Sequence, residues 1–367
     1  MIIESVELKD FRNYREAKVE LDEGTNILYG DNAQGKTNLL ESLYMSGTSR
    51  SFRGSRDRDM IRFGGEEGHI RTVIKKSGGR YQIDIHLKKN KTKGIAVNRI
   101  PIKKASDLFG IADFVLFSPE DLYIIKQGPA QRRRFIDTEL CQLDKVYYHF
   151  LWDYNHALYQ RNQLLKDIAY NPSLLDTLDV WDMQLANCGR KIIEEREKFV
   201  SSLEKIIKEI HLHLSGGREC LEIAYEKNAD ADFLYEKIRD GRDRDLKMKT
   251  STVGPHRDDL YFAVDDVDIR RFGSQGQQRT AALSLKLSEI EIVRRETGEN
   301  PVLLLDDVLS ELDQNRQRFL LKNIEDVQTV ITCTGIDEFV KERFAIDRIF
   351  FVSEGTITEK KNSAEGK

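Results

Sequence analysis

The sequence has no long apolar run, no paired cysteines and no excess of positive charge. Its four cysteines lie far apart, with no CxxC pair and no neighbouring histidine at metal-ligand spacing. No apolar stretch approaches the roughly 18 residues of a membrane span. The first residues, MIIESVELKDFRNY, are acidic where a signal peptide would be basic. These absences favour a cytoplasmic protein with free thiols and no membrane contact.

The net charge of −4 does not by itself indicate a nucleic-acid binder. It does not exclude one, because phosphates are bound by a local basic patch rather than by the total charge. Hydrophobic residues make up 40% of the chain, which is typical of a globular protein and too many for a disordered one. The length suggests about two structural units.

Hydrophobic periodicity divides the chain into three parts. Residues 1–118 alternate as strands, including antiparallel strands over 69–98, with one helix after residue 35. Residues 119–245 carry apolar side chains mostly at helical spacing. Residues 246–367 alternate helices with strands that are apolar on both faces, which is typical of a covered parallel sheet. We therefore expect a mixed α/β host, 1–118 and 246–367, with an antiparallel subdomain and an inserted helical domain at 119–245.

The strongest motif matches G-x-x-x-x-G-K-[ST] and lies between an apolar strand, TNILY, and an amphipathic helix. Its glycines let backbone N–H groups converge on phosphates, and the helix N-terminus adds partial positive charge. The lysine reaches the β- and γ-phosphates, and the threonine hydroxyl reaches Mg²⁺. A chance match in a chain of this length arises about once in a hundred. The predicted nucleotide site contains Gly30, Asp31, Asn32, Ala33, Gln34, Gly35, Lys36 and Thr37.

Two aspartates, Asp306 and Asp307, end the buried strand VLLLDD. Ligands of open α/β sheets bind at the C-terminal edge of the strands, where these carboxylates would lie. The motif predicts Asp306 in the magnesium shell and Asp307 as the group that orients or deprotonates the attacking water. The alternative is that one of the two aspartates simply caps the following helix.

A second motif, SQGQQR, opens a long helix at Ser274. Ser274 and Gln277 fit an S-x-x-Q capping box, a common helix start. Ser274, the Gly276 backbone and the helix dipole could also bind a terminal phosphate. One nucleotide does not need two such helix starts. We therefore expect the Ser274 helix of one copy to close over ATP held by a second copy.

With these motifs the sequence resembles an ABC-type ATPase head of the SMC kind. GDNAQGKT resembles the Walker A motif, SQGQQR the signature, VLLLDD Walker B, and SELD at 310–313 the D-loop. The resemblance is closer still to the RecF family of bacterial recombination mediators. It rests on FRNY at 11–14, FSPEDL at 117–122, GPAQRRRFID at 128–137 and GPHRDDL at 254–260, which span most of the chain in the expected order.

The resemblance implies an ATP-dependent homodimer with weak ATP hydrolysis that acts as a slow switch. It implies binding to single-stranded, duplex or gapped DNA, and partnership with the RecFOR mediator proteins that load the recombinase RecA. The processes implied are DNA repair, recombination, replication-fork maintenance and the SOS response. By position, Lys36 and Asp307 are catalytic, Thr37 and Asp306 hold Mg²⁺, and Arg12 and Asn13 lie near the nucleotide.

Several features depart from the SMC pattern. Asp307 stands where SMC-like heads usually have glutamate, which suits a slow switch. The segment FSPE at 117–120 lacks the Q-loop glutamine, and TCT at 332–334 lacks the switch histidine. The 236 residues between Thr37 and Ser274 are too few for a long coiled coil, so the helical insert must be a short arm.

Three basic runs are candidates for DNA contacts. One lies in the loop after the phosphate-loop helix, one is a lysine run (88–93) at a predicted hairpin tip, and one begins the helical insert. Each run can equally be a solvated face, and the lysines can protect a sheet edge. We predict contacts mainly to backbone phosphates. The residues chosen are Arg50, Arg53, Arg56, Arg132, Arg133 and Arg134.

Three other functions stay open at this stage. A simple P-loop phosphotransferase would have no use for SQGQQR. A structural SMC-like chromosome ATPase would need heptads over hundreds of residues. An ATPase-coupled nuclease would need a further acidic metal cluster, for which Asp258 and Asp259 are the only candidates.

Overall fold

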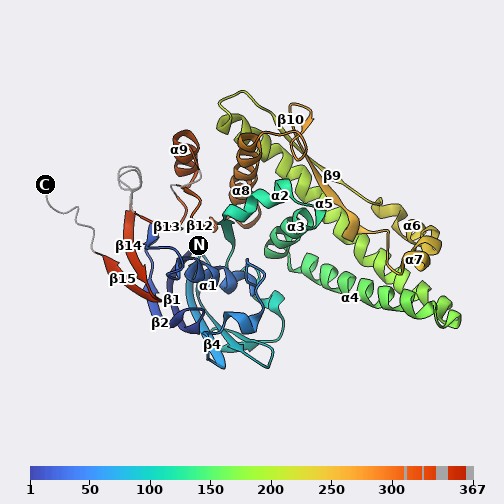
Figure 1. The fold of residues 1–367 in the computed structure, drawn as a ribbon, viewed down its shortest axis with the longest axis horizontal. Helices are drawn as coiled ribbons and strands as arrows, with labels where there is room; N and C mark the ends of the chain where they lie inside the picture. The colour runs from blue at the N-terminus through green and yellow to red at the C-terminus, as the bar shows by residue number, and fades with distance from the viewer. Residues whose placement is uncertain (310–311, 325, 336–345, 361–367) are drawn as a thin grey trace. The chain divides into compact units, whose positions relative to one another are not determined.

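The computed structural model describes residues 1–309, 312–324, 326–335 and 346–360. The chain forms two compact units (Figure 1): unit 1 comprises Met1–Asp121 and Glu289–Lys367, and unit 2 comprises Leu122–Ser288. Unit 2 begins close to the expected start of the insert at residue 119. It continues beyond residue 245, because the strands that follow pair with one another and one of them packs on a helix of unit 2.

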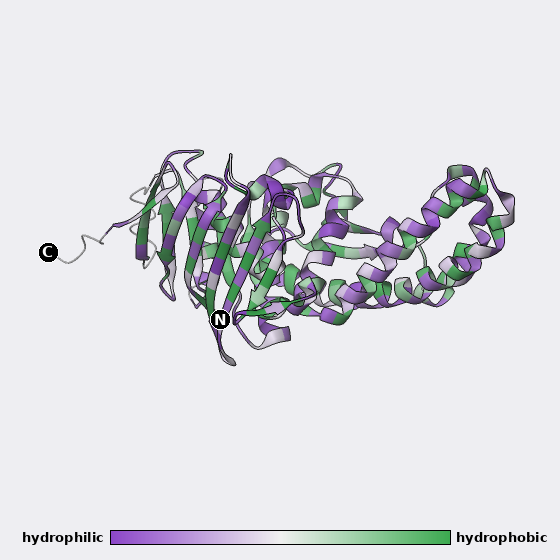
Figure 2. Ribbon diagram, turned by 90° about the horizontal axis from the view of Figure 1, so that it is seen from below, coloured by the Kyte–Doolittle hydropathy of each residue, from purple (hydrophilic) through white to green (hydrophobic). Residues whose placement is uncertain are grey.

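Unit 1 contains two six-stranded sheets. The first is antiparallel throughout, with the order β2-β1-β4-β5-β6-β7. Its strands are β1 (Ile2–Phe11), β2 (Tyr14–Glu20), β4 (Glu67–Lys76), β5 (Gly79–Lys88), β6 (Gly94–Val97) and β7 (Ile100–Ile102). The antiparallel strands predicted over 69–98 are thus confirmed, and Figure 2 shows hydrophilic and hydrophobic residues alternating along strands of this unit.

The second sheet has the order β15-β14-β3-β13-β12-β8. All neighbours from β14 to β8 are parallel, and only β15 runs antiparallel to its partner. Its strands are β3 (Thr25–Tyr29), β8 (Phe114–Phe117), β12 (Val302–Asp306), β13 (Thr329–Cys333), β14 (Ile346–Ser353) and β15 (Thr356–Lys360). This confirms the predicted parallel sheet, in which β12 is buried along its whole length and β13 is buried except at Cys333.

Helix α1 (Lys36–Thr48) contacts strands of both sheets, including β4 and β5 of the first and β12 and β13 of the second. Its apolar side chains Leu39, Leu40 and Leu43 are fully buried in the core that the two sheets share. Because α1 follows β3 after only a short loop, its N-terminus is fixed at the C-terminal edge of the parallel sheet. Unit 1 also contains α9 (Gln314–Asn323).

Unit 2 is mainly helical, as the spacing of apolar residues predicted. Its two longest helices, α4 (Lys145–Ile168) and α5 (Leu178–Leu214), pack together. A three-stranded sheet of order β11-β10-β9 packs on α5 through β9. The remaining elements are α2 (Leu122–Lys126), α3 (Pro129–Leu143), β9 (Leu221–Glu226), α6 (Leu234–Asp240), α7 (Arg242–Met248), β10 (Asp259–Val264), β11 (Val267–Asp268) and α8 (Gln275–Thr297), which ends in unit 1.

Among the helices of the described residues, none combines the length and the hydropathy that crossing a bilayer requires.

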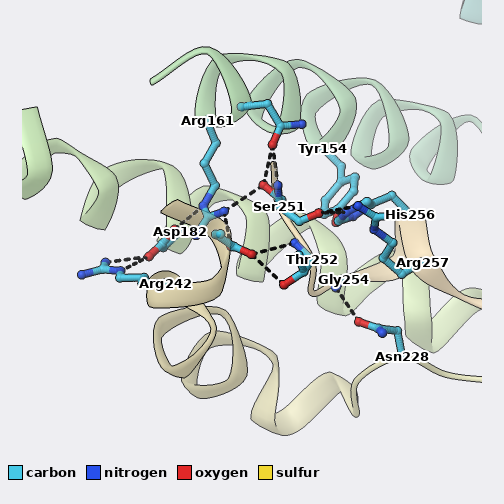
Figure 3. A network of polar contacts seen from close by, with 12 residues as sticks. Tyr154, Arg161, Asp182, Asn228, Arg242, Ser251, Thr252, Gly254, His256 and Arg257 are labelled. Carbon is cyan, nitrogen blue, oxygen red and sulfur yellow. Dashed lines mark hydrogen bonds and ion pairs between the residues drawn. The ribbon is translucent and has the colours of Figure 1, made fainter. Parts of the chain in front are cut away.

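A buried polar network ties α4 and α5 to the segment after α7 (Figure 3). The Arg161 guanidinium is fully buried and donates to Asp182 (2.6 Å) and Asp245 (2.6 Å). It also donates to the Ser251 hydroxyl at 2.8 Å. Arg161 therefore crosslinks three segments far apart in sequence, and removing a buried ionic partner of this kind typically costs about 3–5 kcal/mol.

His256 closes one end of this network. Its Nδ1 lies 2.6 Å from the Tyr154 hydroxyl, and its Nε2 lies 3.0 Å from the Ser251 carbonyl oxygen. The carbonyl can only accept, so Nε2 carries the proton and Nδ1 accepts from Tyr154. Burial lowers the pKa of His256 from 6.5 to about 4, because a buried imidazole disfavours its charged form.

This depressed pKa predicts an acid-sensitive stability. Between pH 6.5 and 4 the unfolded chain binds a proton at His256 that the folded chain does not, so stability falls as the pH falls through this window. The loss attributable to His256 is at most about 3 kcal/mol. Urea unfolding at pH 7.5, 6, 5 and 4.5 should show a steeper decline for the native chain than for His256→Gln. Replacing exposed His149 by Gln is the control and should leave the decline unchanged; parallel curves for the native chain and His256→Gln would contradict the assignment.

Candidate nucleotide site

Three parallel strands bring the predicted nucleotide residues to one edge of the second sheet. β13 lies between β3 and β12. Its Thr332 pairs in register with Leu28 on β3 and with Asp306 on β12. The loop that follows β3, the end of β13 and the carboxylate at the end of β12 therefore meet at the C-terminal edge, where α/β sheets bind their ligands.

The phosphate loop, Gly30–Thr37, is built to hold an anion. Gly35 is the N-cap of α1 and offers no side-chain cap, so the first N–H groups of the helix point toward the loop without an internal partner. The Lys36 side chain is buried, and its ammonium donates to the carbonyl oxygens of Gly30 (2.6 Å) and Asp31 (2.8 Å). These carbonyls hold the positive charge inside the loop, where phosphate oxygens can take their place.

The turn between β1 and β2 braces the loop from outside. The Asn13 amide donates to the Gln34 carbonyl at 2.7 Å, and the Tyr14 hydroxyl donates to the Gly35 carbonyl at 2.9 Å. Burial raises the pKa of Tyr14, so its hydroxyl keeps the proton that this bond needs. Gly35 has a φ of +122°, and a Cβ there would lie 2.7 Å from the Asn13 amide nitrogen. The loop can pass the turn this closely only with glycine.

Arg12, in the same turn, is directed to α1 rather than into the loop. Its guanidinium makes a two-bond ion pair with Glu41, at 2.8 and 2.7 Å, and Glu41 is fully buried. It also donates to the Ser55 hydroxyl at 2.6 Å. Asn13 accepts from Asn38 at 2.8 Å. The FRNY motif thus positions the phosphate loop and the first turns of α1, a role that its letters alone did not reveal.

A carboxylate and two hydroxyls meet beside the loop. Asp306 Oδ1 accepts from the Thr37 hydroxyl at 2.8 Å and from the Thr332 hydroxyl at 2.9 Å. The sequence paired Thr37 with Asp306 as metal ligands, and the structure brings the two together. Thr332 was missed as a contributor, although its place at the end of the neighbouring strand was a usable signal.

Asp307 follows in a left-handed conformation, with φ of +55°, and its backbone N–H donates to the Thr332 hydroxyl at 3.0 Å. One hydroxyl therefore links the carboxylate of Asp306 to the backbone of Asp307. Because Asp306 is hydrogen-bonded to Thr37 and Thr332 beside the loop, the alternative that it caps the next helix does not hold. In the described chain that cap is Asp313, which accepts from the N–H groups of Asn315 and Arg316.

The oxygen set beside the loop fits a magnesium ion. Mg²⁺ takes hard oxygen donors and is usually bound by only one or two protein side chains, with phosphates and water completing its shell. The Thr37 hydroxyl and the Asp306 carboxylate, 2.8 Å apart, provide such a pair. Within the described part of the chain, no group of three or more His, Cys, Asp or Glu side chains could hold a metal.

The second helix start, in unit 2, forms the expected capping box. The Ser274 N–H donates to the Gln277 side chain at 2.9 Å, and the Gln277 N–H donates to the Ser274 hydroxyl at 3.2 Å. Ser274 and Gly276 are both exposed. Of the predicted D-loop, Ser310 and Glu311 lie outside the described residues.

The arginines of the basic runs differ in exposure and in hydrogen-bond partners. Arg50 and Arg56 are exposed, and exposed Arg53 donates to Asn38 at 3.1 Å, next to Thr37. Arg134 is exposed, and Arg133 is half-buried and donates to the Asp258 carbonyl. The prediction that Arg132 contacts DNA is wrong: its side chain is buried and pairs with Asp259 through two bonds, at 2.5 and 3.0 Å.

Arg132 is buried as part of a larger ionic cluster, in which the motifs GPAQRRRFID and GPHRDDL contact each other. Besides the Arg132–Asp259 pair, the buried guanidinium of Arg196 bridges Asp137 (2.8 Å) and Asp258 (3.2 Å). Asp258 also accepts from the Asn228 N–H. Both aspartates of GPHRDDL are thus neutralised by arginines, which argues against the nuclease alternative that relied on them.

The two sheets, the loop between β3 and α1, and the paired hydroxyl and carboxylate define the fold class as an SMC-like ABC ATPase head. The family model described as "RecF/RecN/SMC N terminal domain" matches residues 2–358. A crystal structure of an Smc head bound to the C-terminal winged-helix domain of ScpA covers 100% of this chain with a TM-score of 0.59 at 16% identity, which supports the fold.

Within this class the chain belongs to the RecF family. It is 60% identical to the DNA replication and repair protein RecF of Agathobacter rectalis, covering 97% of this chain and 99% of that protein. It also matches the structure described as "Structure of the recombination mediator protein RecF-ATP in RecFOR pathway" with a TM-score of 0.92 at 37% identity. That match covers 98% of this chain and 97% of the other.

Thr332 should be important for the stability of the site. Thr332→Val keeps the shape of the side chain but removes the hydroxyl that serves both Asp306 and the Asp307 N–H, so we expect a loss of about 1–2 kcal/mol in unfolding free energy. Thr332→Ser keeps the hydroxyl and should retain most of the native unfolding free energy. The control Thr329→Val, on the same strand, removes a hydroxyl that donates only to the Val327 carbonyl. Urea unfolding with equal stability for Thr332→Val and the native chain would show that the link contributes nothing.

Proposed function

We propose that this chain is an ATP-dependent, DNA-binding recombination mediator that acts in the cytoplasm. It would dimerise on ATP at gaps or at junctions of single strand and duplex, and promote recombinase loading with the partner proteins of the RecFOR pathway. Its cellular roles would be DNA repair, replication-fork maintenance and the SOS response. One observation carries this proposal: in a chain of the RecF family, the phosphate loop and the α1 N-terminus, which has no side-chain cap, lie beside the hydrogen-bonded pair Thr37–Asp306.

The roles of the nucleotide residues follow from their surroundings. Lys36 would move its donors from the loop carbonyls to the β- and γ-phosphate oxygens, while the N–H groups of residues 31–37 bind the same oxygens. Bound Mg²⁺ would neutralise charge on the β- and γ-phosphates, with Thr37 and Asp306 as its protein ligands. Asp307 would orient the attacking water. Since its side chain is one methylene shorter than glutamate, we propose slow hydrolysis.

Arg12 and Asn13 would act through the loop. Asn13 fixes the Gln34 carbonyl, and Arg12 fixes Glu41 on the helix that carries Lys36 and Thr37. Both would therefore influence nucleotide affinity by positioning the loop.

The second copy is suggested by Gly276. Apart from its chain neighbours and the backbone of its own helix, the nearest described atom to a Cβ at this position would be the Ser274 hydroxyl oxygen, at 3.8 Å, which is an ordinary contact. Alanine would favour a helix here by up to about 1 kcal/mol, so the fold of the single chain does not explain the glycine. Close approach of a ligand does explain it. We propose that this ligand is the γ-phosphate of ATP bound to the other copy, held by Ser274 and the Gly276 backbone.

DNA would be bound through phosphates. Arg50 and Arg56 in unit 1 and Arg134 in unit 2 have exposed side chains, and Arg53 in unit 1 donates to Asn38, next to Thr37 of the phosphate loop. Such contacts confer salt-dependent affinity and little sequence specificity. Of the rival functions, a phosphotransferase would need no second copy, and a structural SMC protein would need longer arms than α4 and α5, with 24 and 37 residues.

The proposal predicts that ATP converts the protein from a monomer to a dimer, which doubles the particle mass in solution. With ATP, mass photometry should find a dimer that is absent with ADP or without nucleotide. Lys36→Arg should remain a monomer and bind ATP weakly. Gly276→Ala should bind ATP with native affinity yet fail to dimerise, because the added methyl group would block only the approach of the nucleotide bound to the other copy.

The same samples should be tested against gapped, duplex and single-stranded DNA by fluorescence anisotropy. Tighter binding is expected only under conditions that give the dimer. If the native chain shows no ATP-dependent change in mass or in DNA affinity, the proposed function is wrong. If Lys36→Arg dimerises normally, the sandwich of two copies is wrong.

A further inference from the structure

One aromatic ring in unit 1 is held entirely in solvent. Phe63 has a relative exposure of 101%, the highest of the exposed large hydrophobic side chains in the described residues. It lies in a turn, Arg62–Gly65, closed by a hydrogen bond of 2.8 Å from the Gly65 N–H to the Arg62 carbonyl. Gly64 has a φ of +82°, as the third residue of a type II turn requires. Phe63 therefore occupies the second position, at the apex.

Hydrogen bonds on both sides of the turn fix the backbone position from which the Phe63 ring projects. The Arg62 N–H donates to the Asp10 carbonyl at 2.8 Å, and the Arg62 guanidinium pairs with the Asp10 carboxylate at 2.7 Å. Met60 and Ile61, just before the turn, are buried in the core of unit 1. On the other side, the Lys89 N–H donates to the Glu66 carbonyl at 3.1 Å. Because the backbone of the turn is already fixed, binding a partner through Phe63 needs little further ordering of the chain beyond the two side-chain torsions of the ring.

The surroundings of the ring are strongly basic. Residues 50–66 and 88–93 carry nine Lys or Arg and only three Asp or Glu, in a chain with a net charge of −4. The two segments lie side by side, because Lys93 Nζ contacts the Ser49 carbonyl (2.6 Å) and Asp57 (2.9 Å), and Lys89 pairs with Glu66 (2.7 Å).

Not all of this charge is neutralised within the chain. Across the described ranges, no hydrogen bond or ion pair engages the charged end groups of Arg50, Arg56 and Lys91, which are exposed. We call these three residues the basic rim. A single exposed hydrophobic residue is normal on a protein surface. The normal occurrence of single exposed hydrophobic residues does not explain an exposed ring on an anchored turn that has unpaired cations on the neighbouring segments.

We propose that Phe63 stacks on an unpaired nucleobase while the basic rim binds the adjacent phosphates. Every base offers a π-face to an aromatic ring, and phenylalanine has no polar atom with which to read base identity, so the contact is independent of sequence. In an intact duplex the bases are stacked on one another, and only the cations find their ligands. The site therefore favours DNA with single-stranded bases. This inference rests on the proposed function and adds the group that would distinguish a gap from duplex.

The experiment compares three variants in the full-length protein with ATP. Binding to labelled single-stranded, gapped and blunt duplex DNA is measured by anisotropy at several salt concentrations. Phe63→Ala should lose about 5- to 50-fold in affinity for single-stranded and gapped DNA and keep its duplex affinity and salt dependence. Arg56→Glu should weaken binding to all three and flatten the dependence on salt. Phe233→Ala is the matched control, since this ring is 62% exposed in unit 2 beside Asp232.

A direct readout comes from Phe63→Trp, which should restore affinity. Its added fluorescence should be quenched by single-stranded DNA and not by duplex, relative to the native chain with Trp152 and Trp181. If the native chain binds DNA in an ATP-dependent way but Phe63→Ala binds single-stranded and gapped DNA equally well, the inference is overturned and the proposed function stands. If the native chain binds no DNA at any nucleotide state, both are overturned.

Discussion

The hydrogen bonds between the β1–β2 turn and the phosphate loop are the constraint on which the site depends. The loop must leave its N–H groups free for an anion, while the carbonyls at its end need hydrogen-bond partners elsewhere in the fold. Asn13 and Tyr14 supply those partners to Gln34 and Gly35. The brace is itself held by Arg12, which reaches Glu41 in the buried centre of α1. The loop, the helix and the first antiparallel sheet are therefore positioned as one unit.

Unit 2 follows a different principle. Its helices bury apolar side chains and are also connected by two buried ionic clusters, one around Arg161 and another around Arg132 and Arg196. Replacing both members of such a pair by apolar groups can be neutral, whereas removing one member is costly. The clusters fix which segments meet, because each guanidinium donates in a fixed geometry that its carboxylate partners must match in spacing and angle. This explains why two charged motifs so far apart in the chain occur together.

The sequence predicted much of the fold and the centre of the site. Short-range patterns were sufficient for the phosphate loop, the buried strands ending in Asp306, the antiparallel hairpins and the capping box at Ser274. It failed where burial depends on a distant partner. Arg132 looks like its neighbours in the run RRR, and its ion pair with the carboxylate of Asp259, 127 residues away, forms only in the folded chain. Thr332 was overlooked for a related reason, since its partners lie on strands that become neighbours only in the folded sheet.

Thr332 also makes its link between β12 and β13 with an uncharged side chain. A histidine at this end of the strand could change its charge near neutral pH, because the unperturbed pKa of its side chain is about 6.5. Here the link between Asp306 and Asp307 passes through a hydroxyl, which stays neutral under any condition in which the protein is folded. The bonds from Thr332 to the Asp306 carboxylate and from the Asp307 N–H to Thr332 therefore hold this edge of the sheet together without a second charged side chain.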